Sequence, residues 1–214
     1  MPLISRSIGF SPVNNRKWLL PISPISDYLK REALYREKAL AMKKRTAPAI
    51  LITGSPGSGK STLMARLIKD IGAGPIAGLS TPEVRKRDLR VGFKMIDLAS
   101  GKEEVLASTS GKGPTVGKYH VNIDAIDTMV KHIEETLPSA RFIFIDEIGK
   151  MELFSSRFKQ FVDRVFLSDK PVVAVVHRAL VPEYRDRGRL FSLTRDNFED
   201  VRTSILSELK SQLD

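Results

Sequence analysis

The chain has 214 residues and is 42% hydrophobic, which is enough to bury one sizeable core. It has no cysteine, which excludes disulfides, zinc–thiolate sites and cysteine nucleophiles, and no apolar run reaches the roughly 18 residues that a membrane helix needs. The formal net charge is +10, and residues 1–46 hold ten Lys and Arg against three Asp and Glu. We therefore expect a monomeric domain over residues 47–214 that makes no membrane contact, preceded by a basic N-terminal extension over residues 1–46.

The extension has two parts. Residues 1–26 hold four prolines, several serines and no acidic residue. This composition fits a disordered segment of a cytoplasmic protein, and it also fits a mitochondrial or plastid transit peptide. Residues 27–45 contain no Gly or Pro, which predicts a surface helix capped by Asp27. The basic arm is either a solvated tail or a nucleic-acid contact, and its basic run "MKKR" has no aromatic neighbours that could stack on bases.

From residue 47 onward, short β-rich runs alternate with helical patterns, as is typical of an α/β sheet protein. The predicted strands span residues 49–53, 91–98, 103–109, 118–123, 141–145 and 171–176. The second and third of these runs read as a hairpin. Helices are predicted over residues 61–70, 124–136, 154–165 and 198–209, with Asn197 as the cap of the last one.

A glycine-rich segment, "ILITGSPGSGKST" over residues 50–62, joins the first predicted strand to the first predicted helix. It satisfies the phosphate-binding pattern G-x-x-x-x-G-K-[ST], in which the glycines let successive N–H groups point at phosphate oxygens. Lys60 is expected to reach the β- and γ-phosphates, and the Ser61 hydroxyl to help hold Mg²⁺. The residues expected to bind nucleoside phosphate are Gly54, Ser55, Pro56, Gly57, Ser58, Gly59, Lys60, Ser61 and Thr62.

A second candidate site follows the apolar strand in "FIFIDEIGK" over residues 142–150. Two adjacent carboxylates beside a buried strand repel each other, and a divalent cation removes that cost. We expect Asp146 to hold Mg²⁺ together with Ser61, and Glu147 to polarise a water for attack on the γ-phosphorus. Catalysis is therefore assigned to Lys60 and Glu147.

Several further polar residues are candidates for the same site. Arginines at positions 85, 87, 90, 185, 187 and 189 are expected in loops, where one of them, or Lys118, either stabilises charge on the γ-phosphate or is a solvated surface cation. The segment "YRDRGR" could close as a lid. His177 ends a predicted strand, where it is either a γ-phosphate sensor or a hydrogen-bonded structural residue. His120 and His132 are read as structural.

The motifs "GSPGSGKSTL", "VGKYHVN" and especially "IDEIGKMELFSSRF" resemble the nucleoside-triphosphatase family first described from thermophiles. The resemblance covers residues 48–205. It implies a P-loop NTPase three-layer sandwich, in which a mostly parallel sheet with a central P-loop strand has helices on both faces and an added β-hairpin. It also implies slow Mg²⁺-dependent hydrolysis of ATP, GTP, CTP or UTP to the diphosphate. The chain departs from the family pattern at Pro114–Thr115 and at Asp88–Leu89.

Two other functions stay open. The first is a kinase that transfers the γ-phosphoryl group of ATP to a nucleotide or small molecule, which would consume ATP only when an acceptor is present. The second is a nucleotide-dependent nucleic-acid-binding module that uses the basic arm and binds in a salt-sensitive way. No N-K-x-D guanine-reading element follows the acidic strand, which favours a tolerant nucleotide site over a dedicated GTPase.

Overall fold

The computed structural model describes residues 29, 32–33, 47–72 and 74–212. The chain divides into two units, Met1–Ala39 and Leu40–Asp214, and the fold below belongs to the second. The predicted segment 1–26 and the cap at Asp27 lie outside the described residues, as does most of the predicted helix 27–45, of which residues 29, 32 and 33 are helical. Within the described part of the chain, no helix combines the length and the apolar character needed to cross a membrane.

Ten strands of the described chain form one open sheet in the order β10-β1-β9-β8-β2-β4-β5-β7-β6, with β3 paired to β4. The parallel part consists of β10 (Arg189–Leu193), β1 (Ala49–Gly54), β9 (Val172–Val176), β8 (Phe142–Ile148) and β2 (Ile76–Ser80). The antiparallel part consists of β3 (Glu83–Lys86), β4 (Leu89–Asp97), β5 (Glu103–Ser108), β6 (Thr115–Val116) and β7 (Tyr119–Val121). The sheet is therefore mixed, with its parallel strands at one end.

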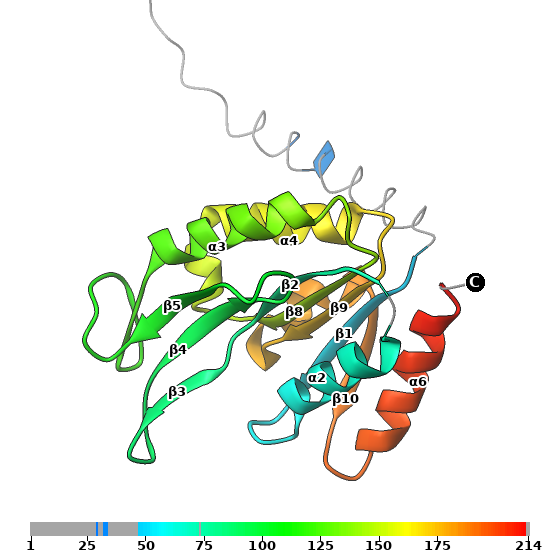
Figure 1. Cartoon of the computed structure of the whole chain (residues 1–214), viewed down its shortest axis with the longest axis horizontal. Coiled ribbons are helices and arrows are strands. Elements are labelled where there is room, and N and C mark those ends of the chain that lie inside the picture. Colours follow the sequence, from blue (N-terminus) through cyan, green and yellow to red (C-terminus); the bar gives the residue numbers. More distant parts are fainter. Residues whose placement is uncertain (1–28, 30–31, 34–46, 73, 213–214) are drawn as a thin grey trace, which may run out of the picture. The chain divides into compact units, whose positions relative to one another are not determined.

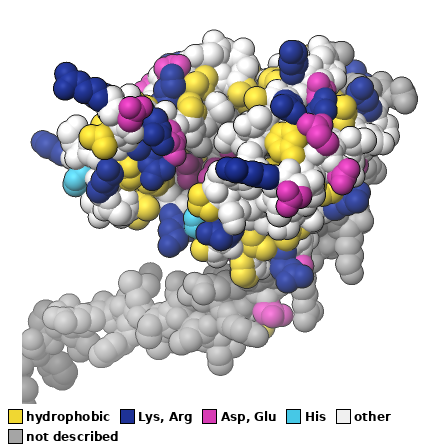
Figure 2. Space-filling view, turned by 90° about the horizontal axis from the view of Figure 1, so that it is seen from below, with side chains coloured by type: hydrophobic (Ala, Val, Ile, Leu, Met, Phe, Trp, Pro, Cys, Tyr) yellow, Lys and Arg dark blue, Asp and Glu magenta, His cyan; other side chains and the backbone are white. Residues whose placement is uncertain are grey.

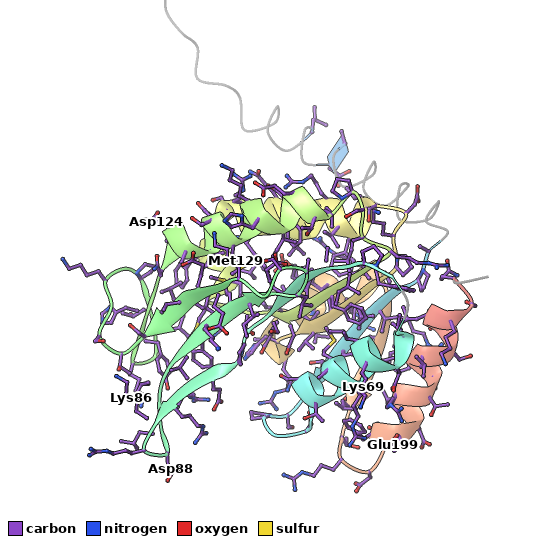
Figure 3. All side chains as sticks on the ribbon, in the orientation of Figure 1. Lys69, Lys86, Asp88, Asp124, Met129 and Glu199 are labelled. Carbon is purple, nitrogen blue, oxygen red and sulfur yellow. The ribbon has the colours of Figure 1, made fainter. Side chains whose placement is uncertain are left out.

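Helices cover both faces of the sheet (Figure 1). Helices α3 (Ile123–Thr136) and α4 (Ser156–Leu167) lie on one face, and α2 (Lys60–Ile71) and α6 (Phe198–Lys210) lie on the other. Short helical turns complete the chain: η1 (Glu152–Phe154), η2 (Arg178–Leu180), α5 (Val181–Tyr184) and η3 (Arg185–Arg187). In α3, the labelled Met129 lies between the helix and the sheet (Figure 3).

Strand β1 shows why the strands of the parallel part have continuous apolar sequences. Its side chains alternate between the two faces of the sheet, and each face is buried under a pair of helices. Leu51 belongs to the core under α3 and α4, whereas Ile50 and Ile52 belong to the core under α2 and α6. All three side chains are fully buried. This burial fixes the position of the glycine-rich loop that follows β1.

The expected α/β class, with a sheet between two helical layers, is confirmed. The added hairpin is larger than expected, because β3, β6 and β7 extend it into a five-stranded antiparallel region. Strand β1 is not central, since only β10 lies between it and one edge of the sheet. Strands β2, β3, β6 and β10 were not predicted. In β2, Gly78 is required because a Cβ there would lie 1.8 Å from the Phe144 carbonyl oxygen, and this glycine obscures the strand pattern.

The prediction that the Asn197 side chain caps the last helix is wrong. Asn197 occupies the N-cap position of α6 but makes no side-chain capping bond. Its amide oxygen accepts a hydrogen bond from the Thr194 backbone N–H, and its amide group donates to the Ser192 carbonyl oxygen. The side chain therefore stabilises the turn before the helix. Its polar atoms bond to backbone groups of that turn and are not available to cap the helix.

Candidate active site

A pocket of about 560 Å³ opens where the parallel strands end, between the glycine-rich loop and the antiparallel strands. Figure 2 shows a hollow between two raised parts of the surface, with acidic side chains inside it and Lys and Arg side chains around it. Residues of the loop, the end of β8, the turn after it and the end of β9 line the pocket. Ligand sites of α/β proteins occupy this end of the strands.

The glycine-rich loop has the geometry of a phosphate cradle. Gly57 and Gly59 have φ angles of +76° and +96°, which side-chain-bearing residues rarely adopt. A Cβ on Gly54 would lie 2.5 Å from the Leu193 carbonyl oxygen, so the chain needs glycine there as well. The Lys60 Nζ donates to the carbonyl oxygens of Gly54 and Ser55, each at 3.1 Å. The loop therefore curls around the ammonium group of its own lysine.

Two hydroxyl groups at or next to this loop are buried. Thr53 Oγ1 and Ser58 Oγ are buried without a hydrogen-bond partner among the described residues. A buried hydroxyl without a partner costs free energy. Ser58 lies inside the predicted phosphate-binding segment. Its hydroxyl does not line the pocket, however, and lies 2.7 Å from where a Cβ on Gly54 would stand. The groups that the loop presents to an anion in the pocket are therefore its backbone and the side chains of Lys60, Ser61 and Thr62.

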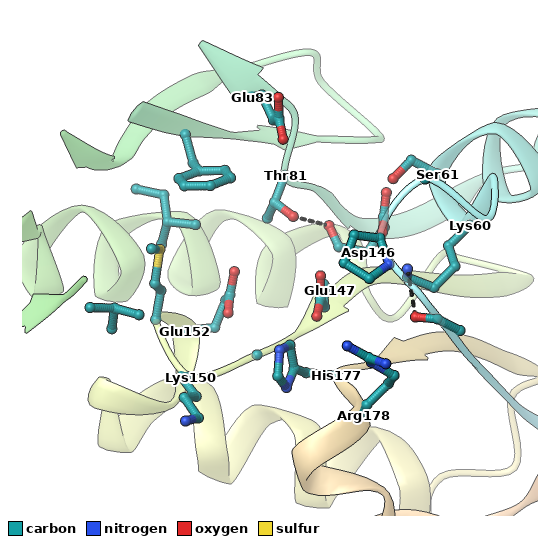
Figure 4. A pocket seen from close by; sticks show the side chains of 18 of the residues that line it. Lys60, Ser61, Thr81, Glu83, Asp146, Glu147, Lys150, Glu152, His177 and Arg178 are labelled. Atoms are coloured by element: carbon teal, nitrogen blue, oxygen red, sulfur yellow. Dashed lines mark hydrogen bonds between the residues drawn. The ribbon is translucent and has the colours of Figure 1, made fainter. Parts of the chain in front are cut away.

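The predicted acidic pair lies next to this loop (Figure 4). Asp146 is 7% exposed, and the Ser61 side chain lies beside its carboxylate (Figure 4). Thr81 Oγ1 donates to the Asp146 carbonyl oxygen at 2.6 Å. Burial raises the pKa of Asp146, while the neighbouring Ser61 hydroxyl and the charge of Lys60 lower it. Burial and the Asp146 charge raise the pKa of Glu147, and the Lys60 charge lowers it. Burial and mutual repulsion make it costly for both acids to be ionised. A cation bound between these carboxylates and a phosphate would reduce that cost.

The residues present fit Mg²⁺. A hydroxyl and a carboxylate are the hard oxygen ligands that this ion takes, and it usually binds one or two protein carboxylates plus substrate phosphates and water. The described part of the chain holds no group of three or more His, Asp or Glu that could hold a metal ion by itself. Ser61 and Asp146 are brought together as the sequence predicts.

A third acid, Glu152, is a site residue that the sequence analysis missed. It follows Lys150 and Met151 in the motif "DEIGKMEL", lines the pocket and is only 5% exposed. Burial is the main reason that its pKa rises to about 8, with smaller contributions from the charges of Glu147 and Asp146. Hydrogen bonds from the backbone N–H groups of Gly149 and Glu152 act in the opposite direction. Glu152 is therefore neutral at pH 7, and sequence gives no sign of this because Glu is rarely buried.

The neutral state of Glu152 predicts a pH dependence of stability. A carboxyl group whose pKa is raised from 4.5 to about 8 on folding destabilises the protein progressively as pH rises through that window, because the unfolded chain loses its proton first. We expect Glu152→Gln to gain stability relative to wild type between pH 5 and pH 8, by on the order of 4 kcal/mol. Urea unfolding at both pH values measures this. A difference between variant and wild type that does not change with pH would contradict the buried neutral state.

His177 lines the pocket and also makes a hydrogen bond within the fold, so its position is compatible with either of the two roles left open for it. Its Nδ1 accepts a hydrogen bond from the Ala179 backbone N–H at 3.2 Å, which orients the ring. Burial lowers the pKa of His177, and the charges of Lys150 and Arg178 lower it further. The imidazole is therefore held neutral at the end of β9. His120 and His132 do not line this pocket.

The arginines are mostly engaged in ion pairs. Arg90 lines the pocket, pairs with Glu83 at 2.6 Å and donates to the Tyr119 hydroxyl at 2.9 Å. Arg85 also pairs with Glu83, at 3.0 Å. The expectation that arginines 85, 90 and 189 lie in loops is wrong, because they belong to β3, β4 and β10. The structure adds Lys150 and Arg178 to the pocket lining, and neither was predicted there.

The segment predicted as a lid is tied to the body of the domain. Arg187 pairs with Asp163 at 2.5 Å and lies 4.6 Å from the centre of the Tyr184 ring. Arg189 lies in β10, which pairs with β1, and its side chain binds Glu208 at 3.2 Å. These contacts hold the segment against the sheet, so it does not have the form of a free lid.

Arg187 is accordingly expected to stabilise the fold without taking part in turnover. Arg187→Ala should lower the free energy of unfolding by about 1–3 kcal/mol, because a half-buried ion pair and a ring contact are lost together. Its rate of phosphate release should stay within about twofold of wild type. Arg185→Ala is the matched control, since that side chain is 66% exposed. A large loss of rate with unchanged stability would assign Arg187 to catalysis instead.

The fold and the pocket together define a P-loop NTPase. A family model described as NTPase matches residues 49–206. The chain is 41% identical over 169 residues to the nucleoside-triphosphatase THEP1 of Methanocaldococcus jannaschii, covering 75% of this chain and 99% of the relative. It is 38% identical over 171 residues to THEP1 of Thermotoga maritima, covering 75% and 95% of the two chains. The chain belongs to the THEP1 nucleoside-triphosphatase family, and hydrolysis of nucleoside triphosphates is its class of reaction.

Solved structures agree with this assignment. The crystal structure of THEP1 from the hyperthermophile Aquifex aeolicus matches 75% of this chain and 98% of its own, with a TM-score of 0.66 and 34% identity. The solution structure of a human cancer-related nucleoside triphosphatase matches 77% and 98% of the two chains, with a TM-score of 0.62 and 29% identity. The resemblance noted in the sequence is thus confirmed.

Proposed function

We propose that this protein is a Mg²⁺-dependent phosphohydrolase that converts a nucleoside triphosphate and water to the diphosphate and phosphate, with broad tolerance of the base. The observation that carries the proposal is the position of Ser61 beside the buried Asp146 carboxylate, next to Glu147 and the loop that holds Lys60 (Figure 4). This arrangement would put a metal-binding pair and a carboxylate base at one end of a phosphate cradle.

The roles follow from these positions. Backbone N–H groups of the loop over residues 54–62 bind the phosphate oxygens, except at Pro56, which has none, and Lys60 neutralises charge on the β- and γ-phosphates. Ser61 and Asp146 would hold Mg²⁺, which neutralises charge that builds up on the phosphate oxygens. Glu147 accepts the proton of the attacking water, and its raised pKa brings it nearer to the range in which a carboxylate is an effective base. Because the His177 Nδ1 accepts the Ala179 N–H, the neutral ring carries its proton on Nε2 and can donate a hydrogen bond from there without adding charge.

Base tolerance is inferred from the kind of residues that surround the cradle. The chain lacks an N-K-x-D element after the acidic strand, and the pocket lining near the loop consists mainly of groups that bind phosphate. Contacts to phosphate are the same for all four nucleotides. The site should therefore select the triphosphate tail rather than the base.

Release of inorganic phosphate from ATP, GTP, CTP and UTP, measured with and without Mg²⁺, tests this proposal. We expect all four to be hydrolysed with kcat/KM values within about tenfold of one another, and turnover to stop when EDTA is added. Turnover of one nucleotide alone would overturn the base tolerance. Turnover in EDTA would overturn the role given to Mg²⁺.

A further inference from the structure

Arg178 follows strand β9, which lies between the strands that carry the two parts of the site. Strand β9 is flanked by β1 and β8, and all three strands are parallel, so their carboxyl ends meet at one edge of the sheet. Ile148, the residue after Glu147, is paired with Val176 of β9, two residues before Arg178. The fold therefore brings Arg178 out between the glycine-rich loop that follows β1 and the acidic pair on β8.

Hydrogen bonds hold the backbone on both sides of Arg178. The His177 N–H donates to the Ile148 carbonyl oxygen at 3.0 Å, and the Leu180 N–H donates to the His177 carbonyl oxygen at 2.8 Å. The Ala179 N–H donates to the His177 ring at 3.2 Å. These bonds fix the start of η2 against the end of β8. The Arg178 side chain is therefore presented from a rigid backbone, as a preorganised catalytic group has to be.

The Arg178 side chain is an unpaired cation that lines the pocket. It is exposed and forms no salt bridge or side-chain hydrogen bond with the described residues. In Figure 4, its guanidinium group is seen between the His177 ring and Lys60, on the side of His177 that faces the loop. Burial lowers the pKa of His177, and the charges of Lys150, Arg178 and Lys60 lower it further. Cations gathered at one pocket repel each other, and an anion bound among them offsets that repulsion.

Two further cations line the pocket, and neither is placed as Arg178 is. Arg90 is paired with Glu83 at 2.6 Å, which offsets its charge. Lys150 is exposed and also lacks a salt bridge among the described residues. In Figure 4, however, Lys150 lies on the opposite side of His177 from the glycine-rich loop. Arg178 is therefore the unpaired cation on the loop side of the pocket.

We propose that Arg178 is a catalytic residue that binds the γ-phosphate of the nucleoside triphosphate and stabilises the charge that builds up there during hydrolysis. This inference rests on the proposed function. The water oxygen bonds to the γ-phosphorus, the bond to the β,γ-bridging oxygen breaks with its electron pair leaving on the diphosphate, and the water proton passes to Glu147. The guanidinium fork donates to two γ-phosphate oxygens. Because this arginine belongs to the same chain, no second protein has to supply it.

The test measures phosphate release from ATP with Mg²⁺ in the full chain, for wild type, Arg178→Ala and Arg178→Lys. We expect kcat of Arg178→Ala to fall by on the order of 10²–10³, the usual effect of losing one donor to the transition state, with KM within about threefold of wild type. Arg178→Lys keeps the charge without the fork, so its kcat should lie between the two. If wild type releases no phosphate, the proposed function fails. If wild type is active and kcat of Arg178→Ala falls by less than about tenfold, only this inference fails.

A second measurement separates contact with the reacting phosphate from an effect on the fold. ADP with aluminium fluoride and Mg²⁺ imitates the phosphoryl group in transfer, whereas ADP with Mg²⁺ alone lacks that group. In Arg178→Ala, binding of the aluminium fluoride complex should weaken by about the same factor as kcat, and binding of ADP alone should stay within about twofold. Equal weakening of both complexes would make Arg178 a general binding or folding residue and would overturn the inference.

Two control variants test whether the effect belongs to Arg178. Arg185→Ala makes the same change at a side chain that is 66% exposed and does not line the pocket, and its kcat should stay within about twofold of wild type. Lys150→Ala removes the other unpaired cation, and its loss of kcat should be at least about tenfold smaller than that of Arg178→Ala. A loss in Lys150→Ala that equals or exceeds the loss in Arg178→Ala overturns the assignment.

Mixing two inactive variants tests whether the arginine acts within its own chain. In a mixture of Arg178→Ala and Lys60→Ala, each chain lacks one of the two cations that contact the γ-phosphate. The rate of phosphate release should equal the sum of the separate rates, because an arginine of one chain does not serve the loop of another. A rate about tenfold or more above that sum would overturn the supply of Arg178 from the same chain.

Discussion

Lys60→Ala is expected to lose nearly all nucleoside-triphosphate turnover, by on the order of 10³-fold or more in kcat/KM. The Lys60 Nζ lies 3.1 Å from the carbonyl oxygens of Gly54 and Ser55, and it is the only cationic side chain in residues 54–62. Without it, charge that builds up on the γ-phosphate has no ammonium group at the loop to stabilise it. Phosphate release under single-turnover conditions measures the loss.

The matched control for this variant is Lys69→Ala. Lys69 lies in the last turn of the same helix α2, is exposed and lies far along the helix from the loop (Figure 3). We expect its rate of phosphate release to stay within about twofold of wild type. Circular dichroism of both variants shows whether α2 is intact. Unchanged phosphate release in Lys60→Ala would refute the assignment of the cradle.

Glu147→Gln is the second large effect. The substitution keeps the size of the side chain and removes the group that accepts the proton of the attacking water. We expect kcat to fall by on the order of 10²–10⁴, the usual range for a general base. Binding of the Mg²⁺–nucleotide complex should be nearly unchanged, because Ser61 and Asp146 remain. Titration with a fluorescent nucleotide and phosphate release measure the two quantities separately.

The control for Glu147→Gln is Glu135→Gln on α3, where the side chain is 62% exposed. It makes the same chemical change outside the pocket and should leave kcat and binding within about twofold of wild type. One result for Glu147→Gln would contradict the assignment of Glu147 as the general base. If nucleotide binding weakens in step with kcat, Glu147 holds the metal or the fold and is not the base.

The sequence alone determined the parts of the site that are local in the chain. The pattern from Gly54 to Ser61 gives a strand, a glycine turn and a helix start in one short stretch, so the backbone shape follows from the residues themselves. The strand before Asp146 is a continuous apolar run for the same reason. The α/β class also follows from local sequence patterns, because short β-rich runs alternate with helical patterns along the chain. The extension over residues 1–46 and its nucleic-acid contact stay predictions.

Only the tertiary structure decided which polar groups are buried and which charges are paired. Glu152 is only 5% exposed, and residues of β4, β5 and β6, which are far from it in the chain, line the same pocket. Arg90 and Arg187 look alike in sequence, yet one lines the pocket and the other holds a short helical turn to α4. Burial and ion pairing are properties of neighbours in space, and the free energy of a charge is set by those neighbours. Local sequence patterns do not include these neighbours, which is why the phosphate loop could be predicted from the sequence and the buried Glu152 could not.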